Sequence, residues 1–283
     1  MIHNTVEIKI DYNKLGIQHV GKPATITTYI KDIYDQVQNP FHRPLVVICP
    51  GGGYEHLSPR EGEAVALKML DLGYNAVILR YSLMPNEFPC ALYEAAYTMK
   101  YVRDHADEWD VNPDKIIIAG FSAGGHLAAS VGTMWNSSEL NDFLQKELKV
   151  SSEVIKPNAM LLGYPVITSG EYAHRASFKN LLGSKYDAMV EKVSLENRVT
   201  KDTPNAFIWH TFADGSVPME NSLLFANALK KADIKFELHI FPDGAHGLGL
   251  GTAETDTKDG THNVPAVAVW PNLFQTWVKN ILE

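Results

Sequence analysis

Short runs of hydrophobic residues recur along this chain and alternate with segments of helical periodicity. The runs are rich in β-branched residues and bounded by turn-forming residues, which favours strands buried on both faces. Six such runs occupy residues 43–50, 75–81, 115–121, 158–166, 205–212 and 236–242. Two earlier segments, 5–12 and 25–32, alternate hydrophobic with polar residues, so the sheet is expected to begin with antiparallel strands.

Amphipathic segments separate the predicted strands. Residues 59–73 begin with a proline and end with a glycine, and residues 91–110 carry a helical hydrophobic stripe. Residues 219–233 and 264–283 also predict helices, the second interrupted near Pro271. The repeated order of strand and helix predicts an α/β fold: a mostly parallel sheet with helices on both faces, in a single domain spanning residues 1–283.

Two segments do not fit this repeat: 135–157 and 168–203. Residues 168–203 follow one strand, precede the next and are long enough for two or three short helices. We therefore expect them to form a small cap over the carboxyl ends of the strands. The glycine-rich segment 246–263 predicts a mobile surface loop. Whether either segment closes over a site stays open at this point.

Composition and charge exclude several classes of partner. Of the 283 residues 45% are hydrophobic, and the net charge of −8 is spread along the chain, so no basic stripe favours nucleic acid. The first residues lack the hydrophobic stretch of about 7–15 residues that a secretory signal needs. No run approaches the roughly 20 apolar residues of a membrane span. We expect a cytoplasmic protein without membrane contact; a homodimer is one alternative for its oligomeric state.

Only two cysteines are present, Cys49 and Cys90. They are too few for a disulfide framework, and neither lies in a spacing typical of metal ligands. The cysteines therefore point to a reducing compartment and to no metal site.

The sequence Gly120-Phe121-Ser122-Ala123-Gly124 matches G-x-S-x-G, in which a serine occupies a sharp turn from strand to helix. Chance alone would place this motif in roughly one chain in ten of this length. Here, however, it follows the strand 115–121 and precedes a helix start of small residues. We predict that Ser122 is a nucleophile; the alternative is an ordinary serine in a glycine-rich loop.

A serine hydroxyl needs a base to take its proton. In hydrolases of this architecture the order is serine, acid, histidine, with the histidine after the last strand, where His246 lies. His126 is one helical turn beyond Ser122 and is expected to support the turn, whereas His210 and His239 lie in strands and should be packed. The other histidines have no motif around them and are expected to be solvated: His3, His19, His42, His56, His105, His174 and His262.

The acid that orients the histidine is expected just after the preceding strand, 205–212, which makes Asp214 our prediction. Asp243 is the rival. It lies only three residues before His246, a spacing more typical of an aspartate that forms a turn.

A glycine-rich stretch, Pro50-Gly51-Gly52-Gly53-Tyr54, follows the strand 43–50. Consecutive glycines allow backbone N–H groups to face a ligand, and the N–H of Ala123 can join them to bind a developing oxyanion. The alternative is a flexible turn.

Four motifs together resemble the α/β-hydrolase superfamily, specifically bacterial esterases related to acetyl xylan esterases and hormone-sensitive lipase. They are CPGGGY (49–54), GFSAGGHLA (120–128), ADGSVP (213–218) and GAHG (244–247). The likeness extends from about residue 40 to the end of the chain. It includes an SxRE element, which reads Ser58-Pro59-Arg60-Glu61 here.

The resemblance implies an α/β-hydrolase fold in which Ser122 is the nucleophile, His246 the base and Asp214 the acid. It also implies an oxyanion hole formed by the N–H groups of Gly51, Gly52 and Ala123, with Gly53, Tyr54 and Tyr164 as candidate substrate-lining residues. The hormone-sensitive-lipase motif has a histidine before its glycines, where this chain has Pro50. One side-chain hydrogen bond to the loop is thereby lost, which leaves open which two glycines face the substrate.

These expectations describe a serine hydrolase that cleaves short-chain carboxylic esters, acetyl esters of sugars in particular, through an acyl-enzyme and without a cofactor. The short-acyl preference follows from the resemblance and from the many charges in the segment 168–203, which differs from the apolar lid of a lipid-interface enzyme. Two alternatives stay open: an amide or peptide hydrolase, arylformamidase-like or dipeptidyl-peptidase-like, and a non-catalytic binding protein of the same fold.

Overall fold

Eight strands form one sheet in the computed structural model, which describes residues 1–34 and 42–282. The order across the sheet is β1-β2-β4-β3-β5-β6-β7-β8. The strands are β1 (Thr5–Glu7), β2 (Thr25–Tyr29), β3 (Arg43–Cys49), β4 (Asn75–Arg80), β5 (Val111–Phe121), β6 (Ala159–Gly163), β7 (Asn205–Thr211) and β8 (Phe236–Phe241).

The pairing follows the hydrophobic pattern. β1 and β2 pair antiparallel, as the alternating segments predicted, and all pairs from β4 through β8 are parallel. All eight predicted strands are present, although the first is much shorter than 5–12. Because parallel strands point the same way, the loops that follow β3, β5, β7 and β8 meet at one edge of the sheet.

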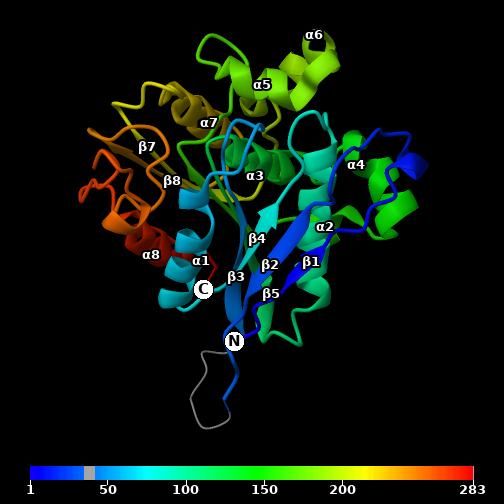
Figure 1. Ribbon diagram of the computed structural model, residues 1–283, viewed down its shortest axis with the longest axis horizontal. Coiled ribbons are helices and arrows are strands. Elements are labelled where there is room, and N and C mark those ends of the chain that lie inside the picture. Colours follow the sequence, from blue (N-terminus) through cyan, green and yellow to red (C-terminus); the bar gives the residue numbers. More distant parts are fainter. Residues whose placement is uncertain (35–41, 283) are drawn as a thin grey trace.

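Helices cover both faces of the sheet (Figure 1). Two helices, α1 (Glu63–Asp71) and α8 (Trp270–Leu282), pack on one face. Three others, α2 (Cys90–Asp104), α3 (Ala123–Met134) and α7 (Glu220–Lys231), pack on the opposite face. The predicted interruption near Pro271 is wrong. Helix α8 begins at Trp270, so Pro271 lies in the first turn, where a missing N–H breaks no helical hydrogen bond.

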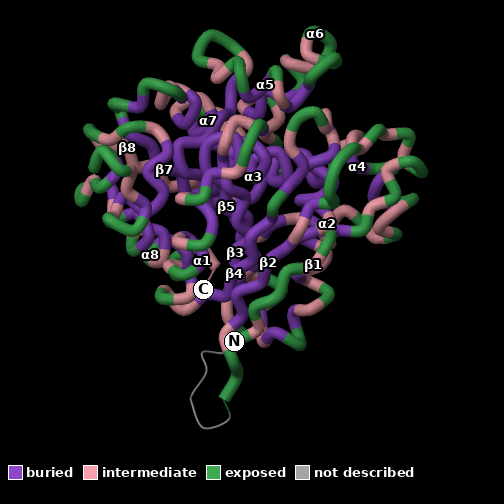
Figure 2. The backbone as a smooth tube through the Cα atoms, viewed as in Figure 1, coloured by how far each residue is buried: buried purple, intermediate pink, exposed green. Residues whose placement is uncertain are grey.

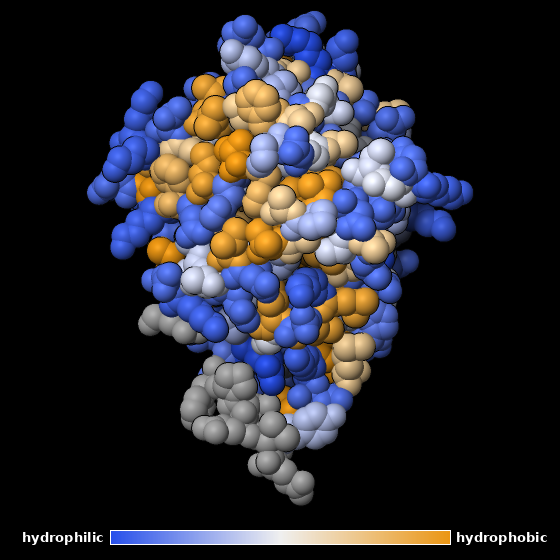
Figure 3. All heavy atoms as spheres, turned by 90° about the vertical axis from the view of Figure 1, so that its left-hand side faces the viewer, coloured by the Kyte–Doolittle hydropathy of each residue, from blue (hydrophilic) through white to orange (hydrophobic). Residues whose placement is uncertain are grey.

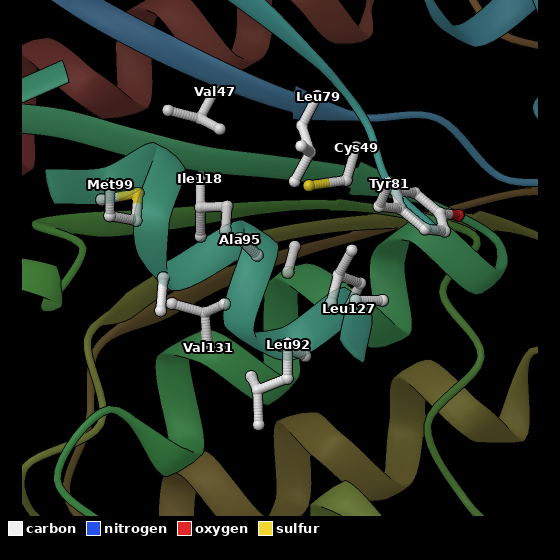
Figure 4. Packing of buried hydrophobic residues seen from close by; sticks show 14 of the residues in the cluster. Val47, Cys49, Leu79, Tyr81, Leu92, Ala95, Met99, Ile118, Leu127 and Val131 are labelled. Carbon is white, nitrogen blue, oxygen red and sulfur yellow. The ribbon is translucent and has the colours of Figure 1, made fainter. Parts of the chain in front are cut away.

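Each central strand contributes side chains to two hydrophobic cores. Val47 and Cys49 of β3 face the core that also contains residues of α2 and α3, as Figure 4 shows. Their neighbours Val46 and Ile48 face the core beneath α1 and α8. The central strands are therefore buried along most of their length (Figure 2), which explains their nearly continuous hydrophobic sequence.

The segments outside the repeat form short helices. Residues 135–157 contain α4 (Ser138–Asp142), the π-helix η3 (Phe143–Leu148) and η4 (Ser152–Ile155). Residues 168–203 contain α5 (Arg175–Leu182), η5 (Gly183–Lys185), α6 (Tyr186–Met189), η6 (Val190–Val193) and η7 (Leu195–Asn197), and α5 and α6 lie at the top of Figure 1. Three 3₁₀ turns complete the elements: η1 (Asn13–Leu15), η2 (Pro59–Glu61) and η8 (Ala253–Thr255).

The segment 246–263 matches the predicted surface loop only in part: residues 258–261 are exposed, but residues 247–251 are buried. Leu248 and Leu250 are buried, and the hydroxyl of Thr255 donates to the Leu248 carbonyl while accepting from the Leu250 N–H. The Trp270 indole also donates to the Gly249 carbonyl. Leucines between the glycines therefore anchor this segment to the core.

No helix in the described ranges 1–34 and 42–282 is both long and hydrophobic enough to cross a bilayer.

Candidate active site

Ser122 lies on a strained turn between β5 and α3. Its backbone has φ 54° and ψ −123°, a conformation that costs a non-glycine residue roughly 1–3 kcal/mol. The flanking glycines make the turn sterically possible. A Cβ on Gly120 would lie 2.0 Å from the Gly124 carbonyl oxygen, and one on Gly124 would lie 2.0 Å from that of Cys49.

A chain of hydrogen bonds joins Ser122, His246 and Asp214. The Ser122 hydroxyl lies 2.7 Å from Nε2 of His246, and Nδ1 of the same ring lies 2.6 Å from Oδ2 of Asp214. A carboxylate can only accept, so Nδ1 carries the proton and Nε2 is left to accept from the serine. The structure thus brings the three predicted residues together, and Asp214 rather than Asp243 contacts the imidazole.

The Asp214 carboxylate receives four donors. Its Oδ1 accepts from the N–H groups of Ser216 and Val217, both at 2.9 Å. Its Oδ2 accepts from His246 and lies 3.3 Å from Nε2 of the fully buried His210. Burial alone would raise the pKa of Asp214, but the hydrogen bonds from His210 and His246 outweigh it and hold that pKa well below its usual range. The acid is therefore charged at neutral pH.

His210 is held in one tautomer. Its Nε2 faces the carboxylate and the Val217 carbonyl at 2.9 Å, which are both acceptors, so Nε2 carries the proton. Its Nδ1 can then accept from the Ser222 hydroxyl at 2.8 Å. The strand position predicted a packed His210, as observed, but not its contact with the acid.

The loop that carries His246, residues 244–250, is called the histidine loop below. Nε2 of His262 donates to the His246 carbonyl at 3.0 Å, and the ring of Tyr164 stands edge-on to the imidazole with centroids 5.0 Å apart. His262 is only 9% exposed, which corrects its prediction as a solvated histidine.

Residues 50–54, called the oxyanion loop below, are held by their carbonyl groups. The Pro50 carbonyl accepts from the Tyr81 hydroxyl at 2.6 Å, and that of Gly51 accepts from the Ser58 N–H at 2.8 Å. The Gly53 carbonyl accepts from the side-chain amide of Asn180 at 2.8 Å. These bonds give each of the three carbonyl oxygens a donor within the protein.

The prediction that the Gly51 N–H forms part of the oxyanion hole is wrong. The Gly51 N–H donates to Oε2 of Glu61 at 2.6 Å, so it is not available to an oxyanion. The N–H groups of Gly52, Gly53 and Ala123 have no hydrogen-bond acceptor within residues 1–34 and 42–282. Gly52 has φ 125°, which a side chain would rarely adopt.

A cavity of about 390 Å³ opens beside Ser122 and His246. Gly53 lines it as predicted, but Tyr54 and Tyr164 do not, because both are buried behind the wall with their hydroxyls bonded to His126 and Glu61. Other lining residues were not predicted: Glu55, His56, Ser58, Pro59, Arg60, Glu61, His174, Ala176, Asn180, Ser216 and Gly247.

His174 and His56 both line the cavity; His56 is also exposed to solvent, as predicted, whereas His174 is partly buried. His174 shares a hydrogen bond of 2.8 Å with Ser177. Burial and the nearby His246 lower the pKa of His174, so its ring is neutral and offers one donor at neutral pH. No sequence motif surrounds it.

His126 connects the oxyanion loop to the segment 168–203. Its Nε2 donates to the Val193 carbonyl at 2.8 Å, and its Nδ1 accepts from the Tyr54 hydroxyl at 2.9 Å. Burial lowers the pKa of His126 to about 4, so the ring is neutral. The supporting role expected from its sequence position matches these contacts.

In the part of the chain that the structure describes, no group of three or more histidine, cysteine, aspartate or glutamate side chains could hold a metal ion. The side chains around Ser122 can carry out proton transfer and nucleophilic attack.

Comparisons with known proteins show which family and which solved structures this chain resembles. The BD-FAE family model matches residues 31–229. Endo-1,4-beta-xylanase B of Butyrivibrio fibrisolvens is 35% identical over 219 residues, and an acetylxylan esterase of Xylanibacter ruminicola is 32% identical over 222 residues. The matches cover 75% and 76% of this chain but only 33% and 43% of those proteins, so the chain spans less than half of either relative.

Among solved structures, the acetyl ester-xyloside bifunctional hydrolase from Caldicellulosiruptor lactoaceticus is 35% identical. It superposes with a TM-score of 0.83 over 98% of this chain and 96% of that one. The carboxylesterase Cest-2923 from Lactobacillus plantarum is 27% identical, with a TM-score of 0.83 over 99% and 98% of the two chains.

Proposed function

The chain belongs to the BD-FAE family, and on this premise we propose that it is a serine esterase that removes acetyl groups from sugars. The α/β-hydrolase fold predicted from the sequence is confirmed, because solved esterases superpose over nearly the whole chain. The observation that carries the proposal is the chain of hydrogen bonds from Ser122 through His246 to Asp214, with free N–H groups beside the serine.

The proposed mechanism follows from the orientation of these groups. His246 takes the Ser122 proton as the serine oxygen attacks the ester carbonyl, and the resulting oxyanion accepts from the N–H groups of Gly52, Gly53 and Ala123. Asp214 stabilises the imidazolium that forms. The imidazolium gives its proton to the departing sugar oxygen, which leaves an acetyl group on the serine. Water, deprotonated by the same histidine, then releases acetate.

The substrate class rests on the relatives and on the cavity. Two relatives are named for acetyl esters, an acetylxylan esterase and an acetyl ester-xyloside hydrolase. The cavity wall offers polar groups to a sugar, including the side chains of His56, His174 and Asn180. Its volume of about 390 Å³ suits a small ester.

Labelling with a fluorophosphonate probe and turnover of acetylated xylose test the proposal. The wild-type protein should react with the probe and release acetate, while Ser122→Ala should lose the label and about a millionfold in kcat. Turnover of p-nitrophenyl esters should fall as the acyl chain lengthens, and a matched p-nitroanilide should be cleaved far more slowly. A protein that does not label, or that cleaves the anilide faster than the ester, would disprove the proposal.

We also propose that residues 168–203 form a cap within a single α/β-hydrolase domain. Their Val193 carbonyl is bonded to His126 of α3, and Asn180 is bonded to the oxyanion loop. We propose a cytoplasmic location as well, which the two buried, unpaired cysteines support.

A homodimer likewise remains a proposal. The side of the molecule at the left of Figure 1 has patches of hydrophobic side chains separated by hydrophilic ones (Figure 3). Exposed Phe212 and Val269 are the large hydrophobic residues after residue 200 that could contact a second copy. Sedimentation at several protein concentrations measures the oligomeric state directly.

A further inference from the structure

Glu61 connects two loops that contribute different parts of the active site. This side chain is only 2% exposed, yet both of its carboxylate oxygens are hydrogen-bonded. Oε2 accepts the Gly51 N–H of the oxyanion loop at 2.6 Å, and Oε1 accepts the Tyr164 hydroxyl at 2.8 Å. The Tyr164 oxygen in turn accepts the Gly249 N–H of the histidine loop at 2.9 Å.

We propose that Glu61 is a positioning residue that holds the oxyanion N–H groups and His246 at the separation that the reaction needs. The inference rests on the proposed esterase function. Glu61 does not take part in proton transfer in this account; it acts through the two loops that it joins.

A neighbouring contact, made by Arg60, also links this region to the histidine loop. Arg60 precedes Glu61 in the chain, and its Nε donates to the Gly247 carbonyl at 3.0 Å. Gly247 follows His246 directly. Residues 60 and 61 together therefore attach the turn that follows the oxyanion loop to backbone groups on the histidine loop.

Glu61 also determines which N–H groups are free. By accepting the Gly51 N–H, its carboxylate fixes the orientation of the first peptide in the glycine run. The left-handed conformation of Gly52, with φ 125°, then continues the turn, and the N–H groups of Gly52 and Gly53 are left without a partner in the described residues.

A side chain at position 51 would not fit beside Glu61 and Ser122. A Cβ there would lie 2.7 Å from Oε2 of Glu61 and 2.8 Å from Cβ of Ser122. The carboxylate is thus packed against the loop close to the nucleophile. With Pro50 at the position where a related motif has a histidine, Glu61 supplies the side-chain hydrogen bond that the proline cannot make.

The test is Glu61→Gln, with Glu94→Gln as the matched control. Glu94 is a buried carboxylate that also accepts a backbone N–H, from Ser82, and a tyrosine hydroxyl, from Tyr12, in addition to the Ser82 hydroxyl, but it is hydrogen-bonded to neither loop. A glutamine at 61 can accept the Gly51 N–H only by donating to Tyr164, whose oxygen already accepts from Gly249. The Tyr164 proton then loses its acceptor, and the loops shift relative to each other.

For Glu61→Gln we expect kcat with p-nitrophenyl acetate to fall about 10- to 100-fold while KM changes less than threefold, because the donors are misplaced only in the transition state. The affinity for a boronic acid that mimics the tetrahedral intermediate should fall by the same factor. Glu94→Gln should stay within about threefold of wild type in both measurements. Thermal unfolding of each variant establishes that it is folded at the assay temperature.

Tyr164→Phe is the second variant, since it removes the link between Glu61 and Gly249 and leaves the Gly51 contact in place. It should lower kcat and boronic-acid affinity together, and it decides the question if Glu61→Gln does not fold. Equal behaviour of the Glu61 and Glu94 variants, or unchanged kcat and affinity for Tyr164→Phe, would overturn the inference. A wild-type protein that neither labels with fluorophosphonate nor turns over the ester would instead disprove the proposed function.

Discussion

Glu94 should make the stability of this protein depend on pH in a way that one substitution removes. The carboxyl group is fully buried on α2, where Oε2 accepts the Ser82 N–H at 2.6 Å and Oε1 accepts the Tyr12 hydroxyl at 2.6 Å. The other titratable groups around it are His19, whose Nε2 lies 3.9 Å from Oε1, and Cys90. Burial raises the pKa of Glu94 to about 7, although the Ser82 and Tyr12 hydrogen bonds oppose the rise.

The magnitude follows from linkage. A pKa near 7 in the folded protein against 4.5 in the unfolded chain corresponds to about 3 kcal/mol, at roughly 1.4 kcal/mol per pH unit. The folded state binds the proton more tightly. The contribution to stability is therefore complete below pH 4.5 and is lost as the pH rises from 4.5 through 7.

Urea unfolding of wild type and Glu94→Gln at several pH values between 4.5 and 8 measures this effect. The glutamine is neutral throughout, and its amide can donate to Tyr12 while its oxygen accepts from Ser82. We expect the free energy of unfolding of the variant, relative to wild type, to rise by about 3 kcal/mol across this range. Titration of the histidines is common to both proteins and cancels in the difference.

Exposed Glu254→Gln controls for the loss of one negative charge. If the wild-type and Glu94→Gln stabilities run parallel between pH 4.5 and 8, then the buried carboxyl is already ionised in the folded protein at low pH, and the reasoning is refuted.

Substitutions at two further histidines test the surroundings of the site. His210→Asn keeps the Ser222 contact but removes the N–H donor to Asp214, so kcat should fall roughly 10- to 100-fold, whereas His210→Gln, whose amide reaches further, should retain most activity. Because the Asp214 pKa is lowered by folding, its contribution to stability is present above about pH 4 and is lost as the pH falls. The urea-unfolding deficit of His210→Asn should accordingly shrink below pH 4; a deficit that grows there would contradict this assignment. His174→Ala should raise KM for acetylated xylose about tenfold and leave p-nitrophenyl acetate within twofold, since only the sugar needs a hydrogen-bond partner. Equal effects on both substrates would exclude a role in sugar recognition.

The elements of the sheet could be predicted because their signal is local. A strand such as β5 needs only a short β-branched run, and the turn at Ser122 needs only glycines on both sides of the serine. Asp214 and His246 were found in the same way, since each follows a predicted strand directly. The geometry then brings them within hydrogen-bond distance of each other.

The predictions that failed depend on contacts between distant segments. Gly51 was expected in the oxyanion hole, but its N–H is taken by Glu61, whose orientation depends on Tyr164, 103 residues further along. Tyr54 and Tyr164 were expected to line the cavity, yet tertiary hydrogen bonds hold both behind its wall. His174 lies in the segment 168–203, which was expected to form a cap, but no motif around this histidine indicated that its side chain lines the cavity.

The position of Cys49 has a practical use. This thiol ends β3 immediately before the oxyanion loop, it is completely buried, and burial raises its pKa far above its usual range. Cys90, the other cysteine, is buried on α2, and burial raises its pKa to about 12. A thiol reagent can modify either residue only when the surrounding structure opens. The rate of Cys49 modification, read by mass spectrometry in the native protein, therefore reports how often the core beneath the oxyanion loop exposes itself to solvent, without any engineered label.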